Sequence, residues 1–103
     1  MIKIVRAAIR FKQLNSDRYS SDEYRIKYGW RHHLIFQEMQ NEGIVYNRND
    51  YQSGFITNEH PIHFVDREEA AKIAYKAGQT PILKETLFSE DLWNIDGTLV
   101  YEK

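Results

Sequence analysis

The stretch that decides the fold is Gly54–Gln79, which reads GFITNEHPIHFVDREEAAKIAYKAGQ. It opens with the extended run Gly54–Thr57, turns through the next four residues and returns as Ile62–Val65. Branched and aromatic residues on both sides of a polar turn are typical of a β-hairpin. We therefore expect the first half of the stretch to form two antiparallel strands.

The second half of the stretch has the periodicity of a helix, with a signal at each end. Asp66 is a favoured N-cap residue, and Glu69 stands three residues later, where it completes a capping box. Gly78 suits the C′ position, because a left-handed backbone costs glycine little. The apolar positions repeat at helical spacing, and they are Ala70, Ile73, Ala74 and Ala77. The small alanine side chains would let this helix lie close to a sheet.

The residues near the N-terminus predict two more strands. Ile2–Phe11 is rich in branched apolar residues, and we expect it to form a central strand. Arg6 and Arg10 would share one face of this strand, which is then either solvated or lines a site. Lys12–Glu23 is polar and predicts a loop, whereas Tyr24–Tyr28 alternates aromatic or apolar residues with basic ones, as in a short edge strand.

A second helix is predicted over Arg31–Asn41, with Gly43 as its stop. Its first turn holds Arg31, His32 and His33, and basic residues there oppose the helix dipole unless an anion is bound. This arrangement predicts either a phosphate site at the helix start or a solvated or partly packed turn. The expected buried positions of the helix are Leu34, Ile35 and Met39.

The remaining segments have weaker signals. Ile44–Ser53 predicts a short apolar segment followed by a polar loop. After the break at Thr80-Pro81, Ser89–Asp91 would either cap a short turn or present acceptors to a ligand. Asp96-Gly97 predicts a turn, and Thr98–Tyr101 predicts a strand that would join this sheet or a neighbour's.

Length and composition indicate one ordinary globular domain over residues 1–103. With the pattern above, they predict an α+β fold in which a small antiparallel or mixed sheet carries two main helices. The formal net charge is −1, which disfavours general nucleic-acid binding but leaves a local basic patch open. No cysteine is present, and no apolar run approaches the roughly 20 residues that span a bilayer. We therefore expect no membrane partner and a reducing compartment.

A survey of catalytic patterns favours binding over chemistry. HExxH, GxSxG, GxxxxGK[ST] and GxGxxG are all absent. The available nucleophiles are serines and threonines without an evident local base. The histidines lack zinc-ligand spacing, because Pro61 between His60 and His63 disfavours a helical pair. We expect no catalytic residue, no metal and no cofactor.

Four segments together resemble a group of small phage-encoded proteins. They are IVRAAIRF, the Arg31-His32 pair, GFIT with FVDREEAAKIAYKAGQ, and LFSEDLW. This group includes the first type of anti-Thoeris defence proteins, which sequester cyclic ADP-ribose isomers made by host immune enzymes. The chain departs from the group in its longer turn NEHPIH and in a C-terminal extension, Asn94–Lys103.

The resemblance implies a site for a molecule that carries an adenine, riboses and two phosphates. Arg31 with His32, and Arg67, are then the candidates for the phosphates. Phe55 would stack on the adenine. Directional polar contacts would come from Gln79, Ser89 and Asp91. Structural alternatives stay open, because Arg67 would otherwise cover apolar surface, Phe55 would be core and Gln79 would only follow a helix end.

The function implied by the resemblance is that of a non-catalytic sponge in the cytoplasm of the bacterial host. Two alternatives stay open. One is an enzyme that hydrolyses such nucleotides, and the other is an interaction protein that inhibits a host factor through its aromatic surface. With 14% aromatic residues and edge-like strands at YRIKY and GTLVY, we also expect a homo-oligomer, a dimer or higher.

Overall fold

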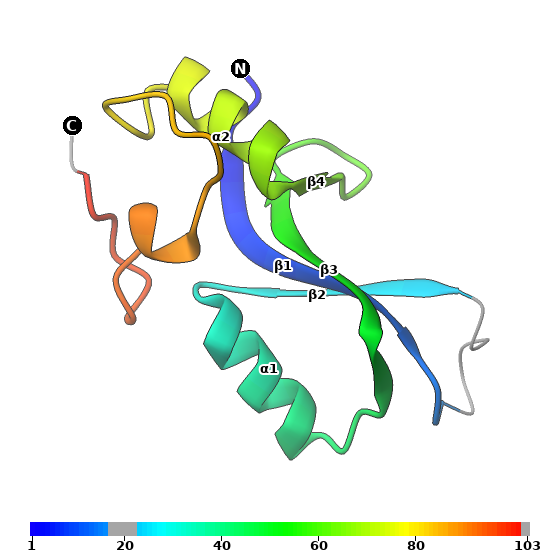
Figure 1. Cartoon of the computed structure of the whole chain (residues 1–103). Helices are drawn as coiled ribbons and strands as arrows, with labels where there is room; N and C mark the ends of the chain where they lie inside the picture. Colours follow the sequence, from blue (N-terminus) through cyan, green and yellow to red (C-terminus); the bar gives the residue numbers. More distant parts are fainter. Residues whose placement is uncertain (17–22, 102–103) are drawn as a thin grey trace.

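The strands and helices are described by a computed structural model over residues 1–16 and 23–101 (Figure 1). In chain order the elements are β1 Ile4–Gln13, β2 Tyr24–Gly29, α1 His32–Asn41, β3 Tyr46–Thr57, β4 Phe64–Asp66, α2 Arg67–Lys76 and the 3-10 turn η1 Ser89–Asp91. The four strands form one sheet in the order β2-β1-β3-β4, and every neighbouring pair is antiparallel. The predicted α+β class is confirmed, with an antiparallel sheet and two helices.

β1 is central, as its apolar sequence predicts, because β2 pairs with it on one side and β3 on the other. Among the described strands β2 has β1 as its single neighbour, so it forms the predicted edge. β1 is longer than predicted at its end. Lys12 pairs with Tyr24 and Gln13 with Tyr46, so the predicted loop starts too early. Residues 17–22 of that loop lie outside the described residues.

The prediction of a short apolar segment and a polar loop over Ile44–Ser53 is wrong. Most of these residues belong to β3, a strand of 12 residues that pairs with β1 over residues 51–57 and again at Tyr46, with a register shift between. Two tyrosine rings hold the polar part of β3. Tyr46 packs edge-on against Phe11 with ring centroids 6.0 Å apart, and Tyr51 packs edge-on against Phe36 at 5.4 Å. Pairing with a neighbouring strand thus overrides weak local β-propensity.

The predicted hairpin is present, with a shorter second strand. Phe55 of β3 pairs with Val65 of β4, and Gly54 pairs with Asp66. β4 begins at Phe64, so the expected return at Ile62 is two residues too early.

The predicted N-cap residue and the predicted C′ glycine of α2 are confirmed. The Asp66 carboxylate accepts a hydrogen bond from the Glu69 amide at 2.8 Å, which is the N-cap bond. At the other end Gly78 has a φ of 74°, the left-handed value that glycine adopts readily. The Gln79 amide then donates to the Ala74 carbonyl at 2.7 Å and closes the helix end.

Removing the cap tests this helix signal directly. Asp66→Ala leaves a first-turn amide of α2 without its acceptor, so we expect the free energy of unfolding to fall by about 1 kcal/mol. Asp66→Asn keeps a side-chain oxygen and should cost less. Urea unfolding followed by circular dichroism measures both changes. Equal stability of the alanine variant and the unmodified protein would contradict the capping role.

One core joins both helices to one face of the sheet. α1 contributes Ile35 and Met39 as predicted, whereas Leu34 is only half-buried and His32 is buried instead. The strands contribute Ile4, Ala7, Ile9, Phe11, Phe55 and Val65. α2 contributes three small side chains, Ala70, Ala71 and Ala74. The alanines allow the close packing that the sequence predicts.

The C-terminal segment folds back instead of adding a strand. Within the described residues, Thr98–Tyr101 joins no strand of the sheet, and its pairing is a single bridge between Leu99 and Trp93. The predicted turn is present, since Gly97 has a φ of 88°. A Cβ at Gly97 would collide with the Trp30 indole, so the tail lies directly against that ring.

Candidate functional site

The seven residues predicted to hold a ligand lie in different places. Phe55 belongs to the core, with its ring centroid 5.2 Å from that of His32. Gln79 lies apart from the others, after the end of α2. The other five gather where α1, α2 and η1 meet, and we term them the junction cluster: Arg31, His32, Arg67, Ser89 and Asp91.

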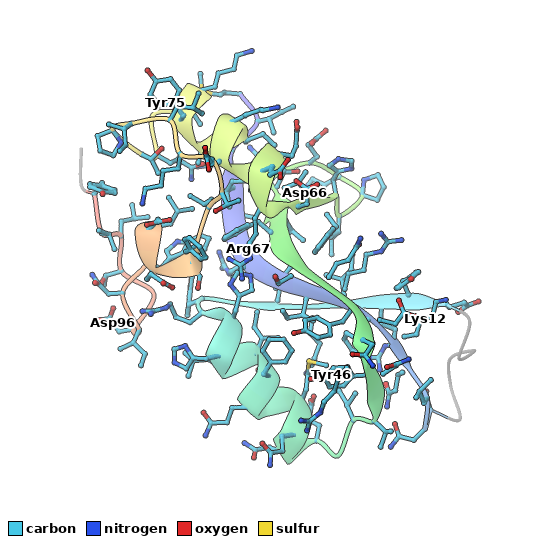
Figure 2. The ribbon with its side chains drawn as sticks, viewed as in Figure 1. Lys12, Tyr46, Asp66, Arg67, Tyr75 and Asp96 are labelled. Atoms are coloured by element: carbon cyan, nitrogen blue, oxygen red, sulfur yellow. The ribbon has the colours of Figure 1, made fainter. Side chains whose placement is uncertain are left out.

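Arg67 ties the junction cluster together from the first turn of α2, between the two helices (Figure 2). Its guanidinium donates to the Ser53 hydroxyl and to the Leu87 carbonyl, each at 3.0 Å. A further N–H faces Nδ1 of His32 at 3.4 Å. Burial lowers the pKa of Arg67 from its ordinary value, and the Glu90 carboxylate opposes this change. Arg67 therefore links β3, α1 and the chain after α2.

His32 is 8% exposed, and its ring is held in one tautomer. Nε2 lies 2.8 Å from the Gly54 carbonyl, which only accepts, so Nε2 carries the proton. Nδ1 faces the Arg67 guanidinium, which only donates, so Nδ1 is an acceptor. Burial lowers the pKa of His32 to about 4, against the effect of the Gly54 hydrogen bond. At neutral pH the ring is therefore uncharged and offers no cation to a phosphate.

Most backbone amides at the start of α1 are already engaged, whereas the buried Nε of Arg31 has no hydrogen-bond partner among the described residues. The His32 amide donates to the Ser89 hydroxyl at 3.3 Å, and the amides of residues 34 and 35 donate to the Arg31 carbonyl at 3.1 Å. The Arg31 guanidinium lies 3.8 Å from the Glu90 carboxylate. Of the two predictions for this turn, the geometry favours the partly packed one.

Asp91 and Phe55 are also engaged within the protein. Asp91 accepts from the Phe88 amide at 2.8 Å and pairs with Lys84 at 2.6 Å. It therefore caps a short turn, the first of the two roles predicted for Ser89–Asp91. Phe55 is 0% exposed, so its ring has no open face for an adenine. The stacking prediction is corrected here, because the ring fills the core between β3 and α1.

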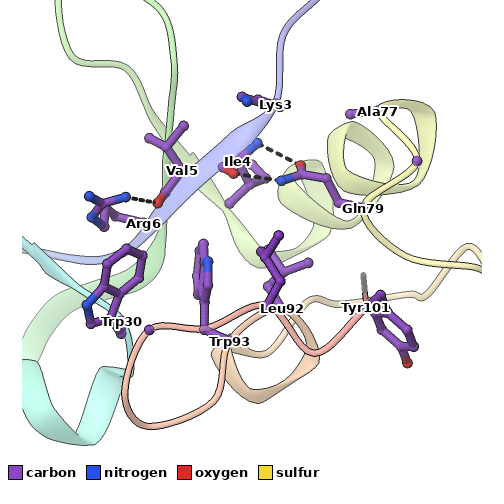
Figure 3. Close-up of a pocket in the computed structure, with 13 residues that line it drawn as sticks. Lys3, Ile4, Val5, Arg6, Trp30, Ala77, Gln79, Leu92, Trp93 and Tyr101 are labelled. Carbon is purple, nitrogen blue, oxygen red and sulfur yellow. Dashed lines mark hydrogen bonds between the residues drawn. The ribbon is translucent and has the colours of Figure 1, made fainter. Parts of the chain in front are cut away.

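A groove opens beside the tail, and Figure 3 shows it in close-up. Its volume is about 560 Å³. The walls come from the start of β1, the end of α2 and the C-terminal segment. We term it the tail groove, and the side chains that matter for its chemistry are Lys3, Arg6, Trp30, Gln79, Trp93 and Tyr101.

Cationic and aromatic side chains meet in the tail groove. The Arg6 guanidinium lies 3.9 Å from the centre of the Trp30 ring, which is a cation–π contact. Arg6 also donates to the Val5 carbonyl at 2.6 Å. Lys3 adds a second cation, and Tyr101 adds an exposed ring with a hydroxyl. This set suits a ligand that joins anionic groups to a flat ring.

Gln79 lines the tail groove, but its side chain serves the backbone of β1 (Figure 3). Its Oε1 accepts from the Ile4 amide and its Nε2 donates to the Ile4 carbonyl, both at 2.8 Å. Both polar ends of the side chain are therefore engaged, so Gln79 shapes one wall of the groove.

Of the residues that line the tail groove, the sequence pattern points to Arg6. Arg6 and Arg10 share a strand face, and lining a site is one of the two roles predicted for them. Arg6 lines the groove, whereas Arg10 turns to Tyr24, 4.2 Å from that ring centre. In the sequence, Trp30 and Trp93 contribute to the high aromatic content of the chain, but nothing there places them together. Their rings meet with centroids 5.8 Å apart because the tail folds back.

Neither a metal centre nor a membrane span is found in the part of the chain that the structure describes. Over residues 1–16 and 23–101, no three His, Asp or Glu side chains are grouped so as to hold a metal ion. No helix in those ranges combines the length and apolarity needed to cross a bilayer.

The fold and the groove define a small α+β protein with one antiparallel sheet and a cationic, aromatic surface groove. Residues 3–93 match the family described as Phage T4 y16D protein, and the chain belongs to that family. A phage protein family agrees with the resemblance to small phage-encoded proteins. The description of the family names no ligand or activity. No curated protein and no solved structure matches the chain. The match ends at Trp93, so Gly97, Leu99 and Tyr101 of the groove wall lie beyond it.

Proposed function

We propose that this phage protein binds a small phosphate-bearing compound of the cyclic nucleotide class in the tail groove and holds it without cleaving it. The observation that supports the proposal is the meeting of Lys3 and Arg6 with the rings of Trp30 and Tyr101 around one groove. The specific form, which the resemblance implies, is sequestration of a cyclic ADP-ribose isomer in the host cytoplasm.

The size and charge of the tail groove support this proposal. Its volume of about 560 Å³ lies within the roughly 300–1,000 Å³ of small-molecule sites. Its described lining residues include two cations and no carboxylate, although the whole chain has a net charge of −1. An anion therefore meets no repelling side chain among them. Arg6 is already held over Trp30, so it loses little further freedom on binding.

Retention without cleavage is supported by the kinds of side chain in the groove. The described lining residues include no serine, threonine, histidine, aspartate or glutamate. A hydrolytic mechanism needs a nucleophile or an activated water with a nearby base. Within this lining, catalysis would have to rely on Lys3 or Tyr101.

The charge of the groove is the feature to remove first. The double variant Lys3→Gln, Arg6→Gln keeps polar side chains but deletes both cations. We expect it to bind cyclic ADP-ribose isomers at least tenfold more weakly, because a hydrogen bond to a charged group contributes about 1.5–3 kcal/mol. Isothermal titration calorimetry measures the affinities.

A matched control for this experiment is Lys72→Gln, Lys76→Gln, which makes the same charge change on α2, outside the groove lining. It should bind like the unmodified protein. Equal weakening by the two double variants would show a general charge effect and contradict a site in the tail groove.

Self-association stays a prediction. β2 has a free edge among the described strands, and Leu99 and Tyr101 expose apolar surface at the groove. A second subunit over this wall would enclose a ligand from both sides.

A further inference from the structure

The face of the sheet that turns away from the core carries basic and aromatic side chains. Cross-strand partners share a face, so Arg10 lies beside Ile26 and Lys12 beside Tyr24. The two neighbours of Arg10 along β1 point the other way and are fully buried in the core. We term this outer surface the open face, and its members are Arg10, Lys12, Tyr24, Ile26 and Tyr28.

The cations of the open face are held in place by their neighbours. Arg10 lies 4.2 Å from the centre of the Tyr24 ring and donates to the Gln52 side-chain oxygen at 3.1 Å. Lys12 lies 4.7 Å from the same ring centre and 3.9 Å from the Asp50 carboxylate. Asp50 also accepts from the Tyr24 hydroxyl at 3.1 Å. In this network two cations face one carboxylate, so the strip is positive although the chain is not.

The tyrosines of the open face stand out from the sheet. Tyr24 is 42% exposed and Tyr28 is 51% exposed. They are four residues apart on β2, so they project on the same side with about 13 Å between them along the strand. The Tyr28 ring is thus accessible to a flat partner, whereas Arg10 and Lys12 lie over the Tyr24 ring. Asp66 of β4 lies in the same cross-strand row as Tyr28, but its carboxylate already accepts the N-cap hydrogen bond of α2.

We propose that the open face binds a single-stranded nucleic acid, with phosphates on Arg10 and Lys12, which Tyr24 holds in place, and a base stacked on Tyr28. Unpaired bases stack on exposed aromatic rings of open four-stranded sheets, while cations follow the backbone. This surface goes beyond the proposed function, because none of its five members lines the tail groove.

The same observations disfavour two other occupants. A duplex hides the faces of its bases, and its tight binding needs a larger basic surface than this strip. A second copy docked face to face about a two-fold axis would bring the positive strip of each subunit against the same strip of the other. Like charges opposed in this way repel. Charge complementarity therefore favours an anionic chain with accessible bases, such as a single-stranded nucleic acid.

Fluorescence anisotropy with a labelled single-stranded oligonucleotide of mixed sequence, about 15 nucleotides long, tests the proposal. We expect a Kd of about 1–100 µM that weakens with salt. Arg10→Gln, Lys12→Gln should weaken binding at least tenfold and reduce the slope of log K against log salt by roughly 1.4, which is about 0.7 for each lost phosphate contact. Tyr28→Ala should weaken binding about tenfold and leave the slope unchanged.

The control variant is Lys72→Gln, Lys76→Gln on α2, which should bind the strand like the unmodified protein. Circular dichroism shows whether each variant is folded, and cyclic nucleotide binding shows whether the tail groove is intact. Three results would overturn the proposal: no binding at low salt, equal binding of the matching duplex, or equal affinity of the open-face and control variants. A dimer in sedimentation equilibrium that Arg10→Gln dissociates would also overturn it, in favour of a second copy.

Discussion

Replacing Phe55 with alanine is expected to lower the free energy of unfolding by about 3–5 kcal/mol. This is a large share of the roughly 5–15 kcal/mol by which small domains are stable. The ring is fully buried, packs edge-on against His32 and lies 6.3 Å from the Trp93 ring between centroids. Its removal leaves a cavity where β3, α1 and the tail meet. Urea unfolding followed by tryptophan fluorescence measures the loss.

Phe88 provides the matched control, since it is also a phenylalanine but is 46% exposed. Phe88→Ala should cost less than about 1 kcal/mol, although it removes a contact with Arg67 at 5.1 Å from the ring centre. A Phe55→Ala protein with unchanged stability and no nucleotide binding would restore Phe55 as a stacking residue and contradict its place in the core.

Lowering the pH from 7.5 to 5 is expected to remove about 2 kcal/mol of stability through His32. The unfolded side chain has a pKa of about 6.5, and burial lowers the pKa of His32 in the folded protein to about 4. The unfolded chain therefore takes up a proton first. The stabilisation is complete above pH 6.5 and declines as the pH falls toward 4. Arg67 opposes protonation of the ring and Glu90 favours it.

The proton can be assigned to His32 with two variants. His32→Gln removes the titrating ring, so the decline in stability between pH 7.5 and 5 should largely disappear, on top of a lower stability at pH 7.5. His33→Gln alters an exposed neighbour and should keep the full decline. Chemical unfolding at several pH values measures the free energy of unfolding of each variant and so its decline with pH. The same pH dependence in both variants would show that the proton binds elsewhere.

Elements with local signals could be predicted from the sequence. The ends of α2 depend on Asp66 and Gly78, whose capping bond and left-handed backbone need only neighbours in the chain. β1 could be predicted as central because a strand paired on both sides and buried in the core needs apolar residues. The alternation in Tyr24–Tyr28 likewise indicates an edge strand with one side in solvent.

Elements that depend on distant partners could not be predicted in this way. The polar half of β3 is held to β1 by pairing at Tyr46 and from Tyr51 onward, and Tyr46 and Tyr51 pack on other rings. The tail has strand-like composition, yet it folds back, with Gly97 against Trp30 and a single bridge to Trp93. Neither contact can be predicted from the spacing of apolar residues along the chain.

The candidate site likewise combines features that the sequence indicates locally with features that depend on distant partners. Resemblance and residue type select Arg31, His32 and Arg67, and the structure does bring them together. The donors of His32 and Arg67 are then used within the protein, which residue type does not indicate, and Arg31 faces the Glu90 carboxylate. Arg6 was open to prediction through its strand face. The partners of Arg6 in the groove, Trp30 and Tyr101, come from segments that only the folded tail places beside it.

The most direct test of the account is to identify what the tail groove retains. Purified protein is incubated with cyclic ADP-ribose isomers and cyclic dinucleotides, washed and denatured by heat, and the released compounds are separated by chromatography. We predict near-stoichiometric recovery of one chemically unaltered cyclic nucleotide, which the Lys3→Gln, Arg6→Gln variant fails to retain. Recovery of a cleaved product, of no nucleotide, or of equal amounts from the variant would contradict the account.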